Sequence, residues 1–432
     1  MRISLFLVAL LSSLQLSLGS KGKDDGGKDD HGHDGHDNDP HACILIAKGH
    51  GADDSPRFLS AVQACSEVII PASTTLNIST RLNMTGLHNK HIVSKSLPFF
   101  PVKYLTAPFR TCKGPSVLIL IFRIGVETVS PSRSKPKSPS GYSAVKTLFW
   151  MEAELLTARA RLDWWDTFAT NSSLLRPITM TIFQATNVVV KNIKMINSPE
   201  WFNLVNEGKN VTYDNININA VSTSTHGPSN TDGWDVYRSD QVTIKNSIIN
   251  NGDDCVSFKP NSTNILVSNL NCNGSHGISV GSLGQFAGMF DIVENVTSTN
   301  VKMSNAQNGA RIKAWAGPNV GSGIVKNVTF ENFVEFNVDN PVVIDQCYMT
   351  NATACAQFPS NTFIQDVVFT NISGTSSGSQ VASLACSPDG RCSDIDVENF
   401  NLSAPTGPPT FVCQNVNLTG NAADLFPTCT VT

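Results

Sequence analysis

One short pattern recurs along the second half of the chain: an aliphatic residue, three further residues and then an asparagine. Each occurrence lies in a run where apolar and polar residues alternate, as in a β-strand with one buried face. The intervals between successive asparagines are 23, 31, 23, 31, 32, 39 and 28 residues, and the asparagines are Asn192, Asn215, Asn246, Asn269, Asn300, Asn332, Asn371 and Asn399. Short strands at such intervals are typical of a solenoid, whose repeats pack against their neighbours.

The strand-like runs, the turns rich in glycine and asparagine and the absence of a long helical period favour an all-β fold. We predict a single-stranded right-handed parallel β-helix with apolar side chains inward and asparagines stacked at a turn. A β-propeller is the main alternative, but each blade needs about four strands, for which the repeat leaves little room. Residues 43–47 are predicted as an N-terminal strand, and the segment up to Cys65 as a short helix that caps the open end.

The N-terminus has the features of a secretory signal. A basic Arg2 precedes an apolar run over residues 3–18, and small residues at 17–19 allow cleavage. We therefore predict a signal peptide at 1–19, a disordered leader of Lys, Asp, His and Gly at 20–40, and one domain at 41–432. His31, His33 and His36 could bind a metal only loosely, so the leader is interpreted as a solvated linker.

The composition limits the partners. The formal net charge is −4, and charged residues make up 15% of the 432 residues, which argues against nucleic acid or an anionic membrane as the main partner. No run beyond the N-terminus is long and apolar enough to span a membrane. A secreted monomer is expected, because a capped solenoid needs no second subunit.

The eleven cysteines fit an oxidising compartment. Their spacing suggests local disulfides, although sequence does not fix connectivity. The suggested pairs are Cys43–Cys65, Cys255–Cys272, Cys347–Cys355, Cys386–Cys392 and Cys413–Cys429, which leaves Cys112 unpaired. Twelve Asn-x-Ser/Thr sequons are consistent with a glycosylated, secreted protein.

Residues 88–162 depart from the repeat. They contain only three glycines, a Ser/Pro/Lys/Arg-rich run and Cys112. We interpret the abrupt change as a mis-spliced or frame-shifted part of the gene model, with a true insertion as the alternative. A transcript that confirmed this reading frame would exclude the first interpretation.

Three polar motifs follow one another at nearly the coil interval: Asn-Thr-Asp at 230–232, Gly-Asp-Asp at 252–254 and Gly-Ser-His-Gly at 274–277. Coils of a parallel β-helix lie about 4.8 Å apart. Asp232, Asp253 and His276 are therefore expected within roughly 5–10 Å of one another. Gly252 is expected to supply the backbone freedom that turns both Asp253 and Asp254 into one groove.

Clustered carboxylates raise one another's pKa, so one can stay protonated as a general acid beside a general base. His276 is predicted to orient or tune that acid. A separation of one to two coils predicts carboxyl groups about 6.5–9.5 Å apart, which is the spacing of inverting glycosidases, whereas about 5–5.5 Å indicates retention.

Arg311 and Lys313 stand two apart and therefore share one face of a strand. A guanidinium beside an ammonium would hold the carboxylate of an acidic sugar, although two solvated surface cations are the alternative. Trp234 and Tyr348 are candidate sugar-stacking platforms, with a place in the core as the alternative for Trp234. Asn230 is a further substrate-binding candidate.

These motifs, with Arg-Ile-Lys at 311–313, resemble the polygalacturonase family of glycoside hydrolases, family 28. The resemblance implies metal-independent, inverting hydrolysis of α-1,4-linked galacturonate on a right-handed parallel β-helix, without a cofactor. By residue, it implies that Asp253 donates the proton and that Asp232 and Asp254 activate water. His276 would support them, and Arg311 and Lys313 would bind the substrate carboxylate.

The longer runs around these motifs look most like the fungal exo-acting branch, since endo-acting members typically carry Phe at the position of Trp234 and Gly at that of Ser275. The predicted activity is exo-hydrolysis at the ends of pectin or polygalacturonate chains. The alternatives are an endo-polygalacturonase, a hydrolase of substituted pectin and a Ca²⁺-dependent lyase. A fourth is an inactive β-helix that binds pectin or fails to fold as written.

Overall fold

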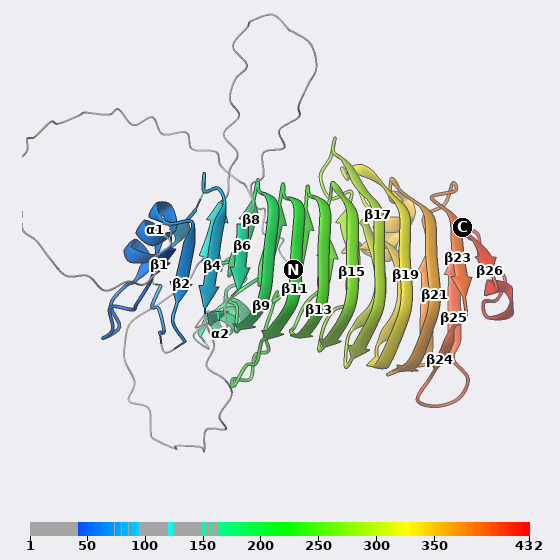
Figure 1. Ribbon diagram of the computed structural model, residues 1–432. Helices are drawn as coiled ribbons and strands as arrows, with labels where there is room; N and C mark the ends of the chain where they lie inside the picture. The colour runs from blue at the N-terminus through cyan, green and yellow to red at the C-terminus, as the bar shows by residue number, and fades with distance from the viewer. Residues whose placement is uncertain are drawn as a thin grey trace, which may run out of the picture.

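The computed structural model describes residues 42–72, 74–78, 80–84, 86–94, 120–123, 149–152, 156–157 and 163–432. These residues form an elongated stack of coils (Figure 1). The predicted signal peptide, the predicted leader and most of the atypical segment 88–162, including Cys112, lie outside the described residues.

The described strands form two parallel sheets that run the length of the stack. The first sheet contains, in order, β1 (Ala42–Ile44), β2 (Glu67–Ile70), β4 (Lys90–Ser94), β6 (Phe149–Glu152), β9 (Thr186–Ile196), β11 (Lys209–Asn219), β13 (Asp240–Asn250), β15 (Ser262–Asn273), β17 (Phe290–Ser304), β19 (Ser322–Val338), β21 (Thr362–Ser376), β23 (Cys392–Glu398) and β26 (Val416–Gly420), with β7 (Leu156–Thr157) on β9 and β24 (Asn401–Ser403) on β21.

The second sheet contains, in order, β3 (Leu82–Asn83), β5 (Leu120–Arg123), β8 (Met180–Phe183), β10 (Asn203–Asn206), β12 (Trp234–Tyr237), β14 (Val256–Phe258), β16 (Ile278–Leu283), β18 (Asn308–Trp315), β20 (Asn340–Tyr348), β22 (Gln380–Ala385) and β25 (Thr410–Gln414). Strands alternate between the two sheets along most of the chain, so each coil contributes one strand to each sheet. The predicted all-β parallel β-helix is confirmed.

The aliphatic member of the sequence repeat forms the core of the first sheet. Its eight occurrences are direct register partners across seven successive strand pairs, from Val188 in β9 to Ile395 in β23. All eight side chains are buried. Stacking each of them on the next coil removes apolar surface from water at every repeat, which is why the pattern persists in the sequence.

The asparagines of the repeat form a ladder at a turn. All eight have a positive φ, between 54° and 58°, a region that asparagine tolerates better than most residues. Their amides bond between coils: Asn215 Nδ2 donates to Asn192 Oδ1 at 2.8 Å, and Asn269 Nδ2 to Asn246 Oδ1 at 3.1 Å. The predicted asparagine stack is confirmed.

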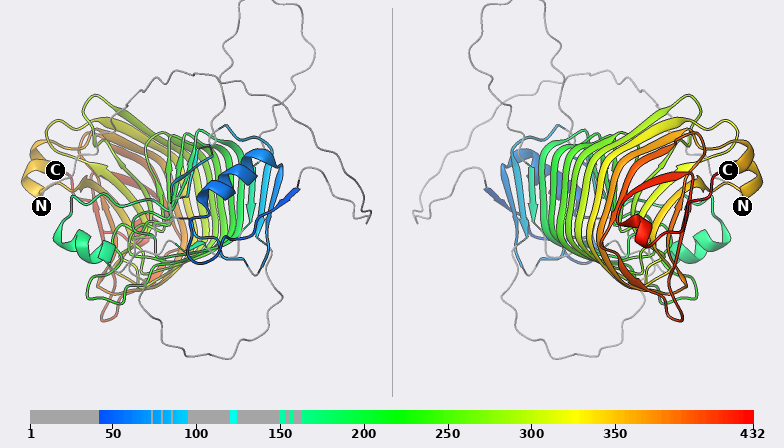
Figure 2. Two further views of the ribbon diagram at one scale, coloured as in Figure 1. Left: turned by 90° about the vertical axis from the view of Figure 1, so that its left-hand side faces the viewer. Right: turned by 90° about the vertical axis from the view of Figure 1, so that its right-hand side faces the viewer.

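Both the cap and the disulfides agree with the sequence. Helix α1 (Ser55–Ala64) lies across the N-terminal end of the stack (Figure 2) and buries Phe58 and Val62. The other described helices are α2 (Asp163–Thr170), α3 (Ala352–Gln357) and the 3₁₀ turn η1 (Ala422–Asp424). All five suggested disulfides are formed. None of the helices in the described ranges has the length and apolarity to cross a membrane.

A phenylalanine stack provides a test of the core. Phe330 in β19 lies parallel to Phe369 in β21, with 5.2 Å between ring centroids, and both side chains are fully buried. Phe330→Ala is expected to lower the free energy of unfolding by about 3–5 kcal/mol, because it removes buried contacts and leaves a cavity. Denaturant titration measures the change. Phe336→Ala, at an exposed position of the same strand, is the control, and an equal loss there would contradict the explanation.

Candidate active site

The polar motifs meet on the second sheet, just before neighbouring strands β12, β14 and β16. Trp234 pairs with Val256, and Val256 pairs with Ile278. Counting two residues back from each places Asp232, Asp254 and His276 on the same level of successive coils. The prediction that Asp253 shares this level with Asp232 is wrong by one residue, because the strand intervals are 22 residues rather than 21 and 23.

Asp232, Asp253 and Asp254 form a carboxylate cluster in which one oxygen of each lies within 4.8 Å of the others. Asp232 and Asp254 are 3% and 1% exposed, whereas the side chain of Asp253 is 18% exposed. The expected spacing of 6.5–9.5 Å is therefore not found between these oxygens. Such a spacing could also surround a cation, but the ammonium of Lys313 already lies 2.6 Å from Asp254.

Gly252 allows this cluster for a reason other than the one predicted. Its φ is not in the left-handed region, but a Cβ at this position would collide with the backbone carbonyl oxygen of Pro228. The close approach of two turns, rather than conformational freedom, requires glycine here.

Asp253 is surrounded by donors. Its carboxylate lies 3.2 Å from His276 Nδ1 and accepts from Asn230 Nδ2 at 3.1 Å and from the backbone N–H of Asp254 at 2.8 Å. Burial acts to raise the pKa of Asp253, but the hydrogen bond and charge of His276 and the charge of Lys313 outweigh it, so that this pKa lies below its usual value. Burial acts to lower the pKa of His276, and Asp253 raises it overall.

Asp232 has the opposite environment. Its Oδ1 is buried without a hydrogen-bond partner among the described residues. Burial, followed by the charges of Asp235 and Asp253, holds the pKa of Asp232 well above its usual range. In this arrangement Asp232 retains a proton, and the Asp253–His276 pair retains a second one on the imidazole.

Lys313 and Arg311 in β18 point to the same face, as predicted, but they make different contacts. The Lys313 side chain is 6% exposed and pairs with Asp254 Oδ2, while Ser279 Oγ donates to Asp254 Oδ1 at 2.7 Å. Arg311 is half-buried, with its guanidinium carbon 5.2 Å from the ring centroid of Tyr348, and it has no ion pair within the described part of the chain. Arg311 is thus the cation left for an anionic ligand, whereas Lys313 neutralises Asp254.

Residues 156–424 match the family model for glycosyl hydrolases family 28. The chain belongs to this family. The "Probable exopolygalacturonase X" of Aspergillus fumigatus is 39% identical over 395 residues, which cover 87% of this chain and 86% of that protein. The "Exopolygalacturonase" of Cochliobolus carbonum is 38% identical over 397 residues, which cover 86% and 83%.

Among solved structures, the endo-xylogalacturonan hydrolase from Aspergillus tubingensis is similar with a TM-score of 0.69 and 28% identity, covering 90% of this chain and 99% of that chain. A polygalacturonase from Erwinia carotovora shares the fold, with a TM-score of 0.58 and 19% identity, covering 88% and 97%. The predicted family is confirmed, and the chain is a glycoside hydrolase.

Two predicted substrate contacts of this family 28 hydrolase take other places. Trp234 is 0% exposed and packs edge-on against Tyr213 at 5.8 Å, so its prediction as a sugar platform is wrong. Alternation places its indole inside the coil while the residues before the strand reach the surface. Asn230 uses its amide between Asp253 and Arg176, whose Nη2 donates to Asn230 Oδ1 at 2.7 Å. Tyr348 is half-buried, near both cations and edge-on to Trp315.

The sequence analysis missed three residues next to the cluster of this hydrolase. Arg176 is buried and lies in none of the motifs, so no sequence signal marks it. Asp235 and Lys259 lie just beyond two motifs and form an ion pair at 3.1 Å. Burial raises the pKa of Asp235 to about 6, against the lowering effect of Lys259. The polar residues that follow a catalytic motif on the same strand are the signal that would have found this pair.

Proposed function

We propose that this chain is an exopolygalacturonase that hydrolyses α-1,4-galacturonosidic bonds at the ends of polygalacturonate chains. The carboxylate cluster beside the unpaired guanidinium of Arg311 carries the proposal, because acid–base groups and a carboxylate-binding cation stand together on one face. The exo mode is supported by the two fungal relatives named exopolygalacturonases.

Asp253 is proposed as the proton donor, because it is the most exposed member of the carboxylate cluster. In the free enzyme the proton of the Asp253–His276 pair rests on the imidazole. Bound substrate excludes water, which disfavours the charged pair and favours transfer of the proton from Nδ1 to the carboxylate. Asp253 then protonates the glycosidic oxygen as the bond from C1 to that oxygen breaks.

Asp254 and Asp232 are proposed to hold the attacking water. Oxygens within 4.8 Å of each other can both contact one water at about 2.8 Å. Lys313 and Ser279 keep Asp254 as an acceptor, so Asp254 takes the proton as the water oxygen bonds to C1. Attack opposite the leaving group inverts the anomeric centre.

The anomer of the first product tests this stereochemistry. Inversion of an α-linkage gives β-galacturonate, and proton NMR during the first turnovers distinguishes it from the α-anomer. The α-anomer would instead indicate a retaining pair, which short carboxylate spacings also fit.

A product analysis tests the activity. Polygalacturonate is incubated with the protein in the presence of a chelator, and the products are separated by size. Galacturonate monomer from the first minutes supports exo-hydrolysis, and a ladder of oligomers indicates endo-hydrolysis. Loss of activity with chelator and an unsaturated product that absorbs in the ultraviolet would indicate a lyase.

We also propose that the protein is secreted after cleavage of residues 1–19 and acts on pectin as a monomer. The basic, apolar and small-residue order of the N-terminus supports secretion. N-terminal sequencing of the exported protein should begin at Ser20.

The His276–Asp253 pair predicts a pH limit. The pKa of His276 is raised in the folded protein, so the pair is fully charged below the ordinary histidine pKa of about 6.5 and is lost as pH rises through the raised value. We expect kcat/KM to fall on the alkaline side at this pKa. His276→Gln should lower kcat/KM by about 10- to 100-fold and remove that limb of the profile.

His91→Gln is the control for the pH profile. His91 pairs with Glu67 at 3.0 Å on the first sheet, away from the carboxylate cluster, so its variant should keep the wild-type profile. An unchanged alkaline limb in His276→Gln would assign that limb to another group.

A further inference from the structure

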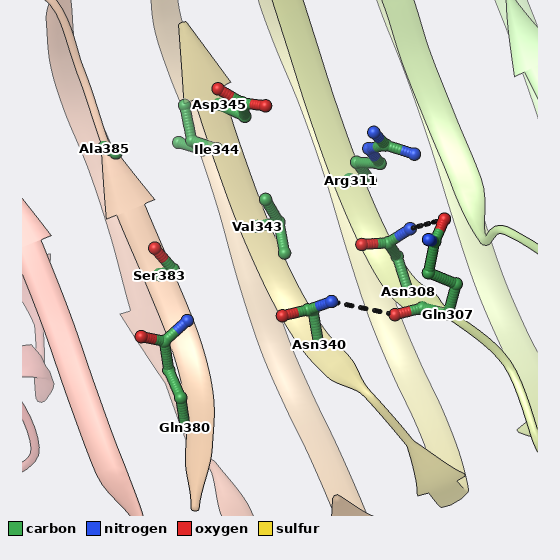
Figure 3. A pocket seen from close by; sticks show the side chains of 10 residues that line it. All are labelled: Gln307, Asn308, Arg311, Asn340, Val343, Ile344, Asp345, Gln380, Ser383 and Ala385. Atoms are coloured by element: carbon green, nitrogen blue, oxygen red, sulfur yellow. Dashed lines mark hydrogen bonds between the residues drawn. The ribbon is translucent and has the colours of Figure 1, made fainter. Parts of the chain in front are cut away.

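A pocket of about 340 Å³ lies beside the carboxylate cluster, over strands β18, β20 and β22 (Figure 3). Arg311 forms its edge toward the cluster. The strands that carry the cluster and the pocket are neighbours in one sheet, so a chain that lies along the coil axis passes from one to the other. The pocket therefore receives a sugar unit beyond the one that Arg311 contacts.

The strand register sets the chemistry of this pocket. One row across the three strands is Arg311, Val343 and Ser383, and the next row is Lys313, Asp345 and Ala385. Each row begins with a cation in β18 and continues without one in β20 and β22. Positive charge on this face is thus confined to the coil nearest the cluster.

The carboxylate of Asp345 makes the far part of the pocket unfavourable for an anion. Asp345 accepts from the backbone N–H of Cys347 at 2.8 Å and has no ion pair among the residues described. Lys313, its neighbour in the row, already pairs with Asp254. Arg311 is two strands from Ser383, about 10 Å away at the usual strand spacing, so it does not neutralise a carboxylate placed there.

The rest of the lining suits an uncharged sugar. Figure 3 shows Gln380 and Ser383 on the pocket side of β22, and neither side chain has a hydrogen bond within the described ranges, so both can bond to hydroxyl or carbonyl groups of a ligand. Val343 and Ala385 are partly exposed and offer an apolar surface for C–H groups or a methyl group.

We propose that this pocket selects an uncharged unit, the methyl ester of galacturonate, next to a free galacturonate held by Arg311. The inference rests on the proposed function and adds to it a substrate preference: the enzyme accepts partly esterified chains better than fully de-esterified ones. Asp345 is the residue that determines this specificity, through repulsion of a third carboxylate.

Two trigalacturonates test the proposal. They differ only in the third unit, counted from the released end, which is a free acid in one and a methyl ester in the other. We expect kcat/KM to be about two- to fivefold higher for the ester, a modest ratio because solvent screens the partly exposed charge. Asp345→Asn should bring the ratio close to one, since the amide keeps an oxygen for the Cys347 N–H but carries no charge.

Asp366→Asn is the matched control, because Asp366 pairs with Lys326 at 3.7 Å on the exposed face of the first sheet. It should keep the wild-type ratio. Equal or better cleavage of the free acid by the wild type, or an unchanged ratio in Asp345→Asn, would overturn the proposal.

Dissociation constants of both trimers for Asp253→Asn, measured by calorimetry, give the same ratio without turnover. They keep the specificity proposal testable if neither trimer is cleaved by the wild type, an outcome that would count against the proposed function alone.

Discussion

Asp253→Asn is expected to lower kcat on polygalacturonate by about 10²- to 10⁴-fold, the range that one general acid contributes. The amide keeps the shape of the side chain and an oxygen for the Asp254 N–H, at 2.8 Å in the native site, so the fold should remain. It cannot give a proton to the leaving oxygen. Steady-state kinetics measure the loss, and circular dichroism checks the fold.

A substrate with a good leaving group separates Asp253 from Asp232, whose raised pKa also makes it a holder of a proton. A nitrophenyl galacturonide needs little protonation of its leaving oxygen. Asp253→Asn should therefore regain most of its activity on this substrate, whereas Asp232→Asn should not, because positioning of the water is still required. Rescue of Asp232→Asn instead would make Asp232 the acid.

Lys313→Met is expected to lower the free energy of unfolding by about 3–5 kcal/mol, because it leaves a buried carboxylate without its cation. Lys313 and Asp254 are 6% and 1% exposed and lie 2.6 Å apart. Turnover should fall as well, since the uncompensated Asp254 would take up a proton and stop accepting one from water. Denaturant titration and kcat measure the two effects.

Two further variants show whether the loss comes from the charge. Lys313→Met combined with Asp254→Asn should recover part of the stability, because no buried charge remains, while turnover stays low. Lys326→Met removes a cation whose partner Asp366 lies 3.7 Å away on the surface, and should cost under about 1 kcal/mol. Equal losses for Lys313→Met and Lys326→Met would contradict the buried ion pair.

The sequence determined the architecture and the membership of the site. The aliphatic–asparagine repeat is enough to predict the parallel β-helix, because each coil repeats the same inward side chain and the same turn, which the register from Val188 to Ile395 confirms. The polar motifs recur at nearly the same interval, so stacking alone brings Asp232, Asp254 and His276 to one place. Local spacing was also enough for the five disulfides.

Only the tertiary structure decided which partner each of these residues takes. Sequence spacing places Lys313 on the right face, but its pairing with Asp254 depends on a contact between residues 59 apart. The burial of Trp234, the approach of Pro228 to Gly252 and the bond from Arg176 to Asn230 are likewise contacts between coils or turns. A repeat fixes which residues lie on each coil, but charge pairing and burial depend on distances across coils, and these arise only when the chain is stacked.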